Sequence, residues 1–309
     1  MINRLPVATE SGFYELDLWK DCQRQQTAVD RQVRSHSALP RMSINRHPRT
    51  IGSLSQYFSE IQRCGIPAVA LWRSQLQETK PQMLLSMLDR HNLGVSSLSM
   101  TGAYSGSHGH TYDDAVRDSR AMINYAAKLQ ADVVIIRTGS QNNHLIKHMH
   151  RLVYRGLMEV IDQADHFGVK LAIQPTHPIM TRDWSCLNSL DNITRLIQRI
   201  NHPLVGLSVS NYHLSEEIQL VDRLQAMIPY IKHVQLSSLP KVCHCEVKWC
   251  LQSKKQTPIA EMVRMLHDTG YKGWFEVMLS QASRLNTMKS DDGYQGCLDC
   301  FNRFWTEVL

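Results

Sequence analysis

Two histidines stand close behind apolar runs of the kind that form buried strands. His177 follows the run that ends at Gln174, and His213 follows the run that ends at Ser210. Histidine changes charge near neutral pH, so this pair is suited to transfer protons or to bind a hydroxyl group. We predict that both take part in a site, with Glu276 as a third candidate acid. The alternatives are that the histidines only support the rim of the fold and that Glu276 is a buried structural carboxylate.

Three more side chains near the ends of apolar runs are candidates for contact with a ligand. Arg137 is placed to bind an anion, and a salt bridge at the rim would explain it equally well. Trp72 and Tyr104 carry aromatic rings that can stack on a sugar, while large residues at the base of a loop also serve packing alone. We predict all three as ligand-binding residues.

The chain has eight cysteines, most of them toward its C-terminal end. Thiolates at short spacings can bind zinc, but only one pair here has the two-residue spacing that is common in zinc sites. Reduced thiols are also the usual state in a large chain without a secretion signal. We therefore expect free thiols and keep zinc as the alternative. The thiols concerned are Cys243, Cys245, Cys250, Cys297 and Cys300.

The elements that position these residues follow a regular alternation of short apolar runs and amphipathic helical stretches. Strands that are apolar throughout and separated by helices form a parallel sheet that is covered on both faces. Eight such units in about 260 residues predict an α/β fold, a single (β/α)8 TIM barrel whose site lies at the carboxyl ends of the strands. The expected strands are 50–51, 68–72, 95–100, 133–136, 170–174, 205–210, 231–236 and 274–279.

The two ends of the chain lie outside this alternation. Residues 1–48 are polar and irregular, and we predict an N-terminal extension that lies on the barrel, is partly disordered or binds a partner. The barrel is expected over residues 49–290. Residues 291–309 are expected to form a C-terminal helix that packs on the barrel.

Composition excludes several classes of protein. A hydrophobic content of 43% and a charged content of 20% are typical of a globular protein. No apolar run approaches the roughly 20 residues needed to cross a bilayer, and the N-terminal residues lack the apolar core of a secretion signal. The net charge of +6 suits an anionic ligand, but the basic residues are dispersed rather than clustered. We expect a cytoplasmic protein with no membrane or nucleic-acid partner, and homo-oligomer formation stays open.

Several dispersed motifs resemble the xylose-isomerase-like sugar phosphate isomerases and epimerases, which share their barrel with the endonuclease IV type of DNA-repair enzyme. Residues 174–178 (QPTHP) resemble the family's Glu-Pro-x-His-Pro, and residues 210–213 (SNYH) resemble its Asp-x-Tyr-His. Local echoes at 65–69 and 270–273 extend the resemblance over about residues 49–280. The resemblance implies a divalent metal, held by carboxylates and a histidine, that stabilises an enediolate while a carboxylate removes a proton.

The same resemblance places neutral side chains where the family has its metal ligands. The family's first Glu falls on Gln174, its Asp on Ser210, its His on Gln235 and its last Glu on Met278. The Asp that follows the third ligand falls on Ser238. Amides, hydroxyls and thioethers are poor partners for a hard dication. We therefore predict no metal and no cofactor, and a nuclease, which needs a metal cluster, is disfavoured for the same reason.

These substitutions predict a divergent isomerase/epimerase-like barrel with a dismantled metal site. It would bind a small sugar-like or anionic ligand, or a partner protein, without turning it over. A second hypothesis is a metal-independent isomerase, epimerase or lyase that uses His177 and His213 as acid and base. A third is a scaffold in which the N-terminal segment and the final helix mediate assembly. Gln174, Ser210, Gln235 and Met278 are the predicted ligand-binding residues of the barrel mouth.

Overall fold

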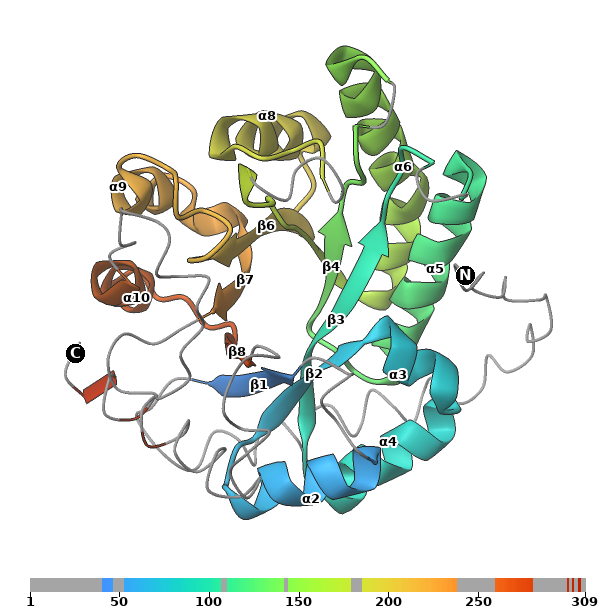
Figure 1. Ribbon diagram of the computed structural model, residues 1–309, viewed down its shortest axis with the longest axis vertical. Coiled ribbons are helices and arrows are strands. Elements are labelled where there is room, and N and C mark those ends of the chain that lie inside the picture. The colour runs from blue at the N-terminus through green and yellow to red at the C-terminus, as the bar shows by residue number, and fades with distance from the viewer. Residues whose placement is uncertain are drawn as a thin grey trace. The chain divides into compact units, whose positions relative to one another are not determined.

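Eight parallel strands form a closed barrel in which each strand pairs with its neighbours in chain order and β1 pairs with β8 (Figure 1). The computed structural model describes residues 41–46, 53–106, 110–141, 144–178, 185–237 and 259–279, together with Asp299, Asn302, Trp305 and Thr306. All of them belong to the compact unit Pro40–Leu309. The predicted TIM barrel is confirmed.

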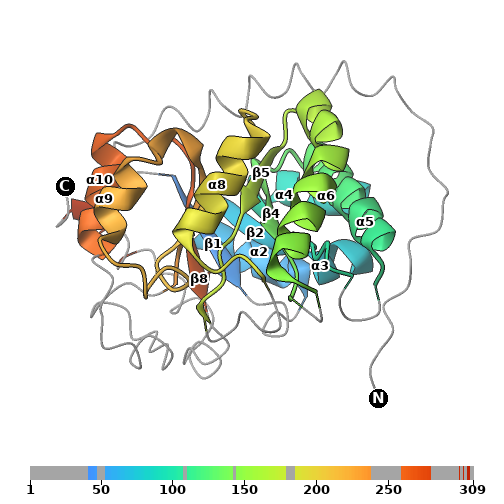
Figure 2. The same ribbon diagram turned by 90° about the horizontal axis from the view of Figure 1, so that it is seen from above.

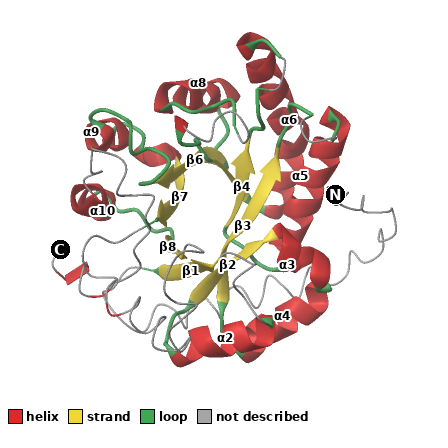
Figure 3. Ribbon diagram, viewed as in Figure 1, coloured by secondary structure: helices red, strands yellow, loops and turns green. Residues whose placement is uncertain are grey.

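The described strands line the centre, and the helices surround them on the outside (Figures 2 and 3). The strands are β1 (Met42–Arg46), β2 (Ala68–Trp72), β3 (Gly94–Gly102), β4 (Val133–Arg137), β5 (Lys170–Ile173), β6 (Val205–Ser210), β7 (Ile231–Leu236) and β8 (Phe275–Leu279). The helices are α2 (Leu54–Arg63), α3 (Arg73–Glu78), α4 (Pro81–Arg90), α5 (Tyr112–Lys128), α6 (Ile146–Phe167), α8 (Leu190–Ile200), α9 (Leu220–Gln225), the short 3-10 helix η3 (Ile228–Tyr230) and α10 (Ile259–Asp268).

The first strand differs from the sequence prediction. It spans Met42–Arg46, inside the range predicted as an N-terminal extension, whereas the predicted strand at 50–51 lies outside the described residues. β1 is in full register with β8, from Met42 opposite Phe275 onward. The reason for the error is that Ser43 and Asn45 are fully buried polar residues, so β1 lacks the uninterrupted apolar run that marked the other strands.

Local signals in the sequence explain where several helices begin and end. The hydroxyl of Thr111 accepts a hydrogen bond from the backbone N–H of Asp114, which caps the start of α5 at 3.1 Å. Ser189 caps α8 in the same way. Gly168 ends α6 in the left-handed conformation, with φ of 67°, which glycine adopts without steric cost.

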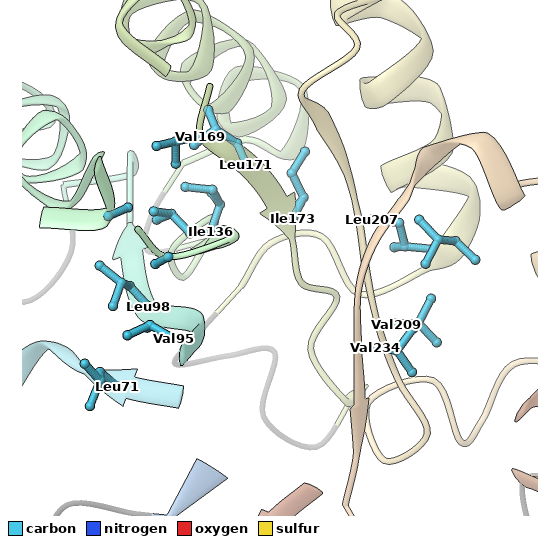
Figure 4. Close-up of a cluster of buried hydrophobic side chains, with 14 of the residues drawn as sticks. Leu71, Val95, Leu98, Ile136, Val169, Leu171, Ile173, Leu207, Val209 and Val234 are labelled. Atoms are coloured by element: carbon cyan, nitrogen blue, oxygen red, sulfur yellow. The ribbon is translucent and has the colours of Figure 1, made fainter. Parts of the chain in front are cut away.

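The hydrophobic core lies mainly between the strands and the surrounding helices. Leu98, Ile136, Leu171 and Leu207 are fully buried members of it (Figure 4). A separate small cluster of Val133, Ile135 and Ala172 is formed by the alternate residues of β4 and β5, which point into the barrel. Much of the remaining barrel interior is polar, and this polar interior leads to the candidate site.

Some predictions concern parts of the chain that the structure describes only in part. Trp305 is buried and packs edge-on against Phe275 of β8, with ring centroids 5.0 Å apart. The zinc-candidate cysteines, from Cys243 to Cys300, lie outside the described residues, so zinc binding there stays an untested alternative. None of the described helices combines the length and the apolar character needed to span a bilayer.

Candidate ligand site at the barrel mouth

The carboxyl ends of β5 to β8 bring together the four positions at which the sequence predicts lost metal ligands. We call Gln174, Ser210, Gln235 and Met278 the four family ligand positions. Ser210 and Gln235 are directly opposite each other in the β6–β7 register. The Nε2 of Gln174 donates to the Oε1 of Gln235 at 3.4 Å. Gln174, Ser210 and Gln235 are buried and Met278 is half-buried.

A directed chain of hydrogen bonds runs through two of these positions. The Nε of Arg137 donates to the Oε1 of Gln174 at 3.2 Å, and Gln174 donates on to Gln235. The Nε2 of Gln235 donates to the Oε1 of Glu276 at 3.0 Å. Because a guanidinium only donates and a carboxylate only accepts, both amides are held in one orientation.

A second branch reaches the same carboxylate from the other side. The indole N–H of Trp72 donates to the Oδ1 of Asn45 at 2.8 Å. The Nδ2 of Asn45 donates to the Oε1 of Glu276 at 2.6 Å. Both branches therefore converge on Glu276. We refer to their members as the mouth network, which consists of Arg137, Gln174, Gln235, Glu276, Asn45 and Trp72.

Glu276 is the anionic centre of this network and is fully buried. Its second oxygen, Oε2, accepts from the hydroxyl of Ser97 at 2.6 Å, that of Ser96 at 3.3 Å and the Nε2 of His233 at 3.0 Å. Burial acts to raise the pKa of Glu276, but the charge of His233 and the hydrogen bonds outweigh it and lower the pKa to about 2. With five donors on two oxygens, Glu276 is a structural anchor in this geometry.

Arg137 places a positive charge at the other end of the network. It is the last residue of β4, and its side chain is half-buried. Burial lowers the pKa of Arg137 to about 10, so the guanidinium stays charged at neutral pH. The predicted position of Arg137 at the mouth agrees with this arrangement.

His213 is neutral, and its tautomer follows from its contacts. Its Nδ1 accepts the backbone N–H of His177 at 3.2 Å, so the ring proton of the neutral form is on Nε2. Burial, followed by the charges of Arg137 and His177, lowers the pKa of His213 to about 3. His213 therefore offers an N–H donor and has no lone pair for a proton.

His177 lies beside His213 at the same end of the barrel. Its ring stacks on Tyr212, with centroids 5.2 Å apart and an interplanar angle of 20°. Its Nε2 is 3.8 Å from the Oε1 of the partly exposed Glu216. The two predicted histidines are thus brought together, as expected for residues that follow neighbouring strands.

The two predicted aromatic residues have different positions. Trp72 is half-buried at the end of β2 and belongs to the mouth network. Tyr104 is fully buried, its hydroxyl is 3.1 Å from the Oγ of Ser119 in α5, and its ring lies against Gly156 in α6. Contrary to the ligand-binding prediction, Tyr104 packs between α5 and α6, where it is fully buried.

Sequence reasoning missed three residues that donate hydrogen bonds to Glu276. Asn45 lies in the strand that was misplaced, Ser97 looks like an ordinary small residue of β3, and His233 was passed over within β7. A signal did exist for the last of these, because His233 precedes Gln235 by two residues and therefore shares its face of the strand.

Comparison with known proteins agrees with this fold. The model of the xylose isomerase-like TIM barrel family matches residues 58–300, which is most of the chain. The chain belongs to this family. No curated protein sequence matches it.

Solved structures of xylose isomerase-like and related barrels overlay on most of the chain. The protein SMc04130 of Sinorhizobium meliloti 1021 has a TM-score of 0.71 at 21% identity, covering 85% of this chain and 97% of its own. D-Psicose 3-epimerase of Clostridium cellulolyticum H10, solved with D-tagatose, has a TM-score of 0.68 at 13% identity, covering 86% and 99%. The IOLI protein, solved with a zinc atom, has a TM-score of 0.70 at 13% identity, covering 87% and 99%. At these identities the likeness is one of fold.

The described residues do not fit the divalent metal that the xylose isomerase-like family implies. Both amide oxygens at the mouth already accept hydrogen bonds, that of Gln174 from a cation and that of Gln235 from Gln174. The carboxylate of Glu276 is saturated by five donors. Within the described ranges, no group of three or more His, Cys, Asp or Glu side chains could hold a metal ion. A hard dication prefers anionic oxygen ligands, which this surface does not offer.

Proposed function

We propose that this xylose isomerase-like barrel binds a small sugar-like or anionic molecule at its mouth without a metal and does not turn it over. The observation that carries the proposal is the mouth network. At Gln174 and Gln235, the amides are locked between the charge of Arg137 and the charge of Glu276. A surface of this kind is organised for recognition by hydrogen bonds.

The states of the acidic and basic groups support binding without turnover. A general base needs a lone pair within reach of the substrate proton. Glu276 is fully buried and accepts five hydrogen bonds, and the Nδ1 of His213 is occupied by the backbone of His177. The loss of a positioned acid or base commonly costs about 10²–10⁴-fold in rate. The solved structure of D-psicose 3-epimerase with D-tagatose makes a sugar-like ligand the first class to test.

A second function, metal-independent catalysis, has one observation in its favour. The Nε2 of His177 lies 3.8 Å from the carboxylate of Glu216, which is partly exposed. A histidine beside a carboxylate can shuttle a proton. This function predicts turnover that resists chelators and is lost in both His177→Ala and Glu216→Gln. Unchanged turnover in either variant would remove that residue from the mechanism.

The proposal is tested by metal analysis and calorimetry on the purified full chain. We expect less than stoichiometric Mn, Co, Mg and Zn by mass spectrometry. We also expect binding of at least one probe among D-tagatose, D-fructose, D-glucuronate and D-glucose 6-phosphate, unchanged by EDTA and without product in chromatography. Gln235→Ala should weaken that binding, while Gln198→Ala, on the exposed face of α8, should not. EDTA-sensitive conversion of a sugar, or no binding of any probe, would overturn the proposal.

A further inference from the structure

A cleft that contains no member of the mouth network lies between α6 and α8, which are neighbours in the outer ring of helices (Figure 1). Its volume is about 200 Å³. Pockets for drug-sized molecules have about 300–1,000 Å³, so this cleft is suited to a smaller ligand. None of its described lining residues is acidic. We call these residues the α6–α8 cleft, and they are His150, Leu187, Asn192, Arg195, Leu196 and Arg199.

Two arginines on one face of α8 give the cleft its charge. Arg195 and Arg199 are about one helical turn apart, and both are exposed. Like charges at this spacing repel each other and destabilise a helix. Arg195 donates to the Oδ1 of Asn192 at 2.8 Å, and the Cζ of Arg199 lies 4.2 Å from the centroid of the Tyr154 ring. Neither guanidinium forms an ion pair with a carboxylate of the described residues, so an anion in the cleft would relieve their repulsion.

The acidic residues near the start of α8 are engaged elsewhere. Asp191 and Glu217 both pair with Arg223. The Oε1 of Glu217 also accepts the backbone N–H of Leu190 at 2.7 Å. These contacts direct both carboxylates to Arg223 and to the backbone, and not to the arginines of the cleft.

A histidine of α6 lines the opposite side of the cleft. The Nε2 of His150 is buried and makes no hydrogen bond with any described residue. Burial, followed by the positive charge of Arg195, lowers the pKa of His150 below its ordinary value. Buried polar groups normally have a hydrogen-bond partner. This nitrogen is therefore available to a ligand that enters the cleft beside Arg195.

We propose that the α6–α8 cleft binds a small phosphate-type oxyanion, held by Arg195 and Arg199 of α8 and by His150 of α6. Arginine binds phosphate through paired, charge-assisted hydrogen bonds. The three side chains approach from two helices, and a tetrahedral anion presents oxygens in several directions, whereas a carboxylate presents two in one plane. Leu187 and Leu196 are buried and form the apolar part of the lining. This site goes beyond the proposed function and does not depend on it.

Calorimetry on the purified full chain with inorganic phosphate, pyrophosphate and malonate tests the inference. At low salt, one of the two phosphate probes is expected to bind with a dissociation constant of about 1 mM or tighter. It should bind at least tenfold more tightly than malonate, a dicarboxylate, and added salt should weaken it. Equal affinity for malonate would overturn the choice of a phosphate-type anion. Absence of binding by both phosphate probes would overturn the site itself.

Three variants and a matched control assign the binding to the cleft. Arg195→Met and Arg199→Met should each weaken the phosphate probe at least tenfold, and His150→Ala at least threefold. Arg151→Met is the control, because Arg151 is an exposed arginine that follows His150 in α6 but does not line the cleft. Its affinity should stay within twofold of the wild-type value. Unchanged binding in either cleft arginine variant would place the anion elsewhere and overturn the inference.

The ring signals of His150 in a nuclear magnetic resonance spectrum give a second readout. Comparison with His150→Gln identifies these signals. The phosphate probe should shift them in the wild-type chain and in Arg151→Met, and much less in Arg195→Met. Bound phosphate that leaves the His150 signals in place would overturn the assignment to this cleft.

The two sites of the molecule are tested separately. Binding of D-tagatose or another sugar-like probe at the mouth should be unchanged in Arg195→Met. If the phosphate probes fail while a sugar-like probe binds, this inference is wrong and the proposed function stands. If no sugar-like probe binds while phosphate binds and depends on Arg195, the proposed function is wrong and the α6–α8 cleft stands.

Discussion

Replacing Glu276 tests whether the mouth network holds the barrel together. In Glu276→Leu, the N–H donors of Asn45, Gln235 and His233 lose their acceptor in a fully buried interior. The two serine hydroxyls can rotate toward other acceptors, but these three N–H groups are directed by their side chains. An unsatisfied buried donor costs about 1–3 kcal/mol, so three cost about 3–9 kcal/mol. The whole free energy of unfolding of a domain is about 5–15 kcal/mol, so this variant should fold poorly or not at all.

Glu276→Gln is the variant that can be measured, because it keeps the shape and removes only the charge. Hydrogen bonds to a charged group contribute about 1.5–3 kcal/mol and neutral ones about 0.5–1.5 kcal/mol. The new NH₂ group also faces donors on at least one side. We expect a loss of about 1–3 kcal/mol in the free energy of unfolding, measured by urea at pH 7.

The lowered pKa of Glu276 determines in which direction pH changes the stability of the barrel. Because the pKa of Glu276 falls from 4.5 to about 2 on folding, the charged form stabilises the barrel above pH 4.5. This stabilisation is lost as the pH falls from 4.5 toward 2, where the carboxyl takes up its proton in the folded state. The difference in the free energy of unfolding between the wild-type chain and Glu276→Gln should therefore narrow as the pH falls from 4.5 toward 2, since glutamine does not titrate.

An exposed acid supplies the control for these measurements. Glu261 lies on the exposed face of α10, and Glu261→Gln should change the free energy of unfolding by no more than about 0.5 kcal/mol. The reasoning would be refuted if Glu276→Gln also stayed within that limit at pH 7. A stability gap of equal size at pH 7 and pH 3 would refute the electrostatic part alone.

Three other experiments have defined outcomes. Gly156→Ala should lower the free energy of unfolding by about 1–3 kcal/mol, although alanine favours helices, because its Cβ would lie 2.3 Å from the Tyr104 ring; a more stable variant in urea would contradict this packing. Trp72→Phe should cost about 1 kcal/mol through the lost bond to Asn45, and an unchanged urea midpoint would show that this branch contributes nothing. The combined changes Gln174→Glu, Ser210→Asp, Gln235→His and Met278→Glu should give Mn²⁺ binding in calorimetry that tightens at least tenfold when Arg137→Met is added. Equal affinities would show that Arg137 does not oppose a metal.

The barrel could be predicted because its signals are local. Apolar runs such as those of β4 and β5 mark buried strands, and Gly168 marks a helix end, whatever the rest of the chain does. The resemblance of residues 174–178 and 210–213 to family motifs then located the mouth and the missing ligands. Each of these inferences uses residues that are close together in the sequence.

The partners in the mouth network could not be read in this way, because they are far apart in the sequence. Asn45 and Glu276 are separated by 231 residues and meet only because β1 closes the barrel against β8. The same closure explains why β1 was misplaced, since Asn45 meets its hydrogen-bond partner Glu276 only when β1 pairs with β8. The direction of the amides, the tautomer of His213 and the outward position of Tyr104 likewise depend on contacts across strands and helices.

The sequence by itself determined the barrel, its family resemblance and the neutral character of the four family ligand positions, since these follow from residue type and local spacing. Only the tertiary structure decided that Glu276 is an anchor and that Arg137 is at the opposite end of a directed hydrogen-bond chain. The physical reason is that a polar side chain has a function only through its partners, and here closure of the sheet brings those partners together.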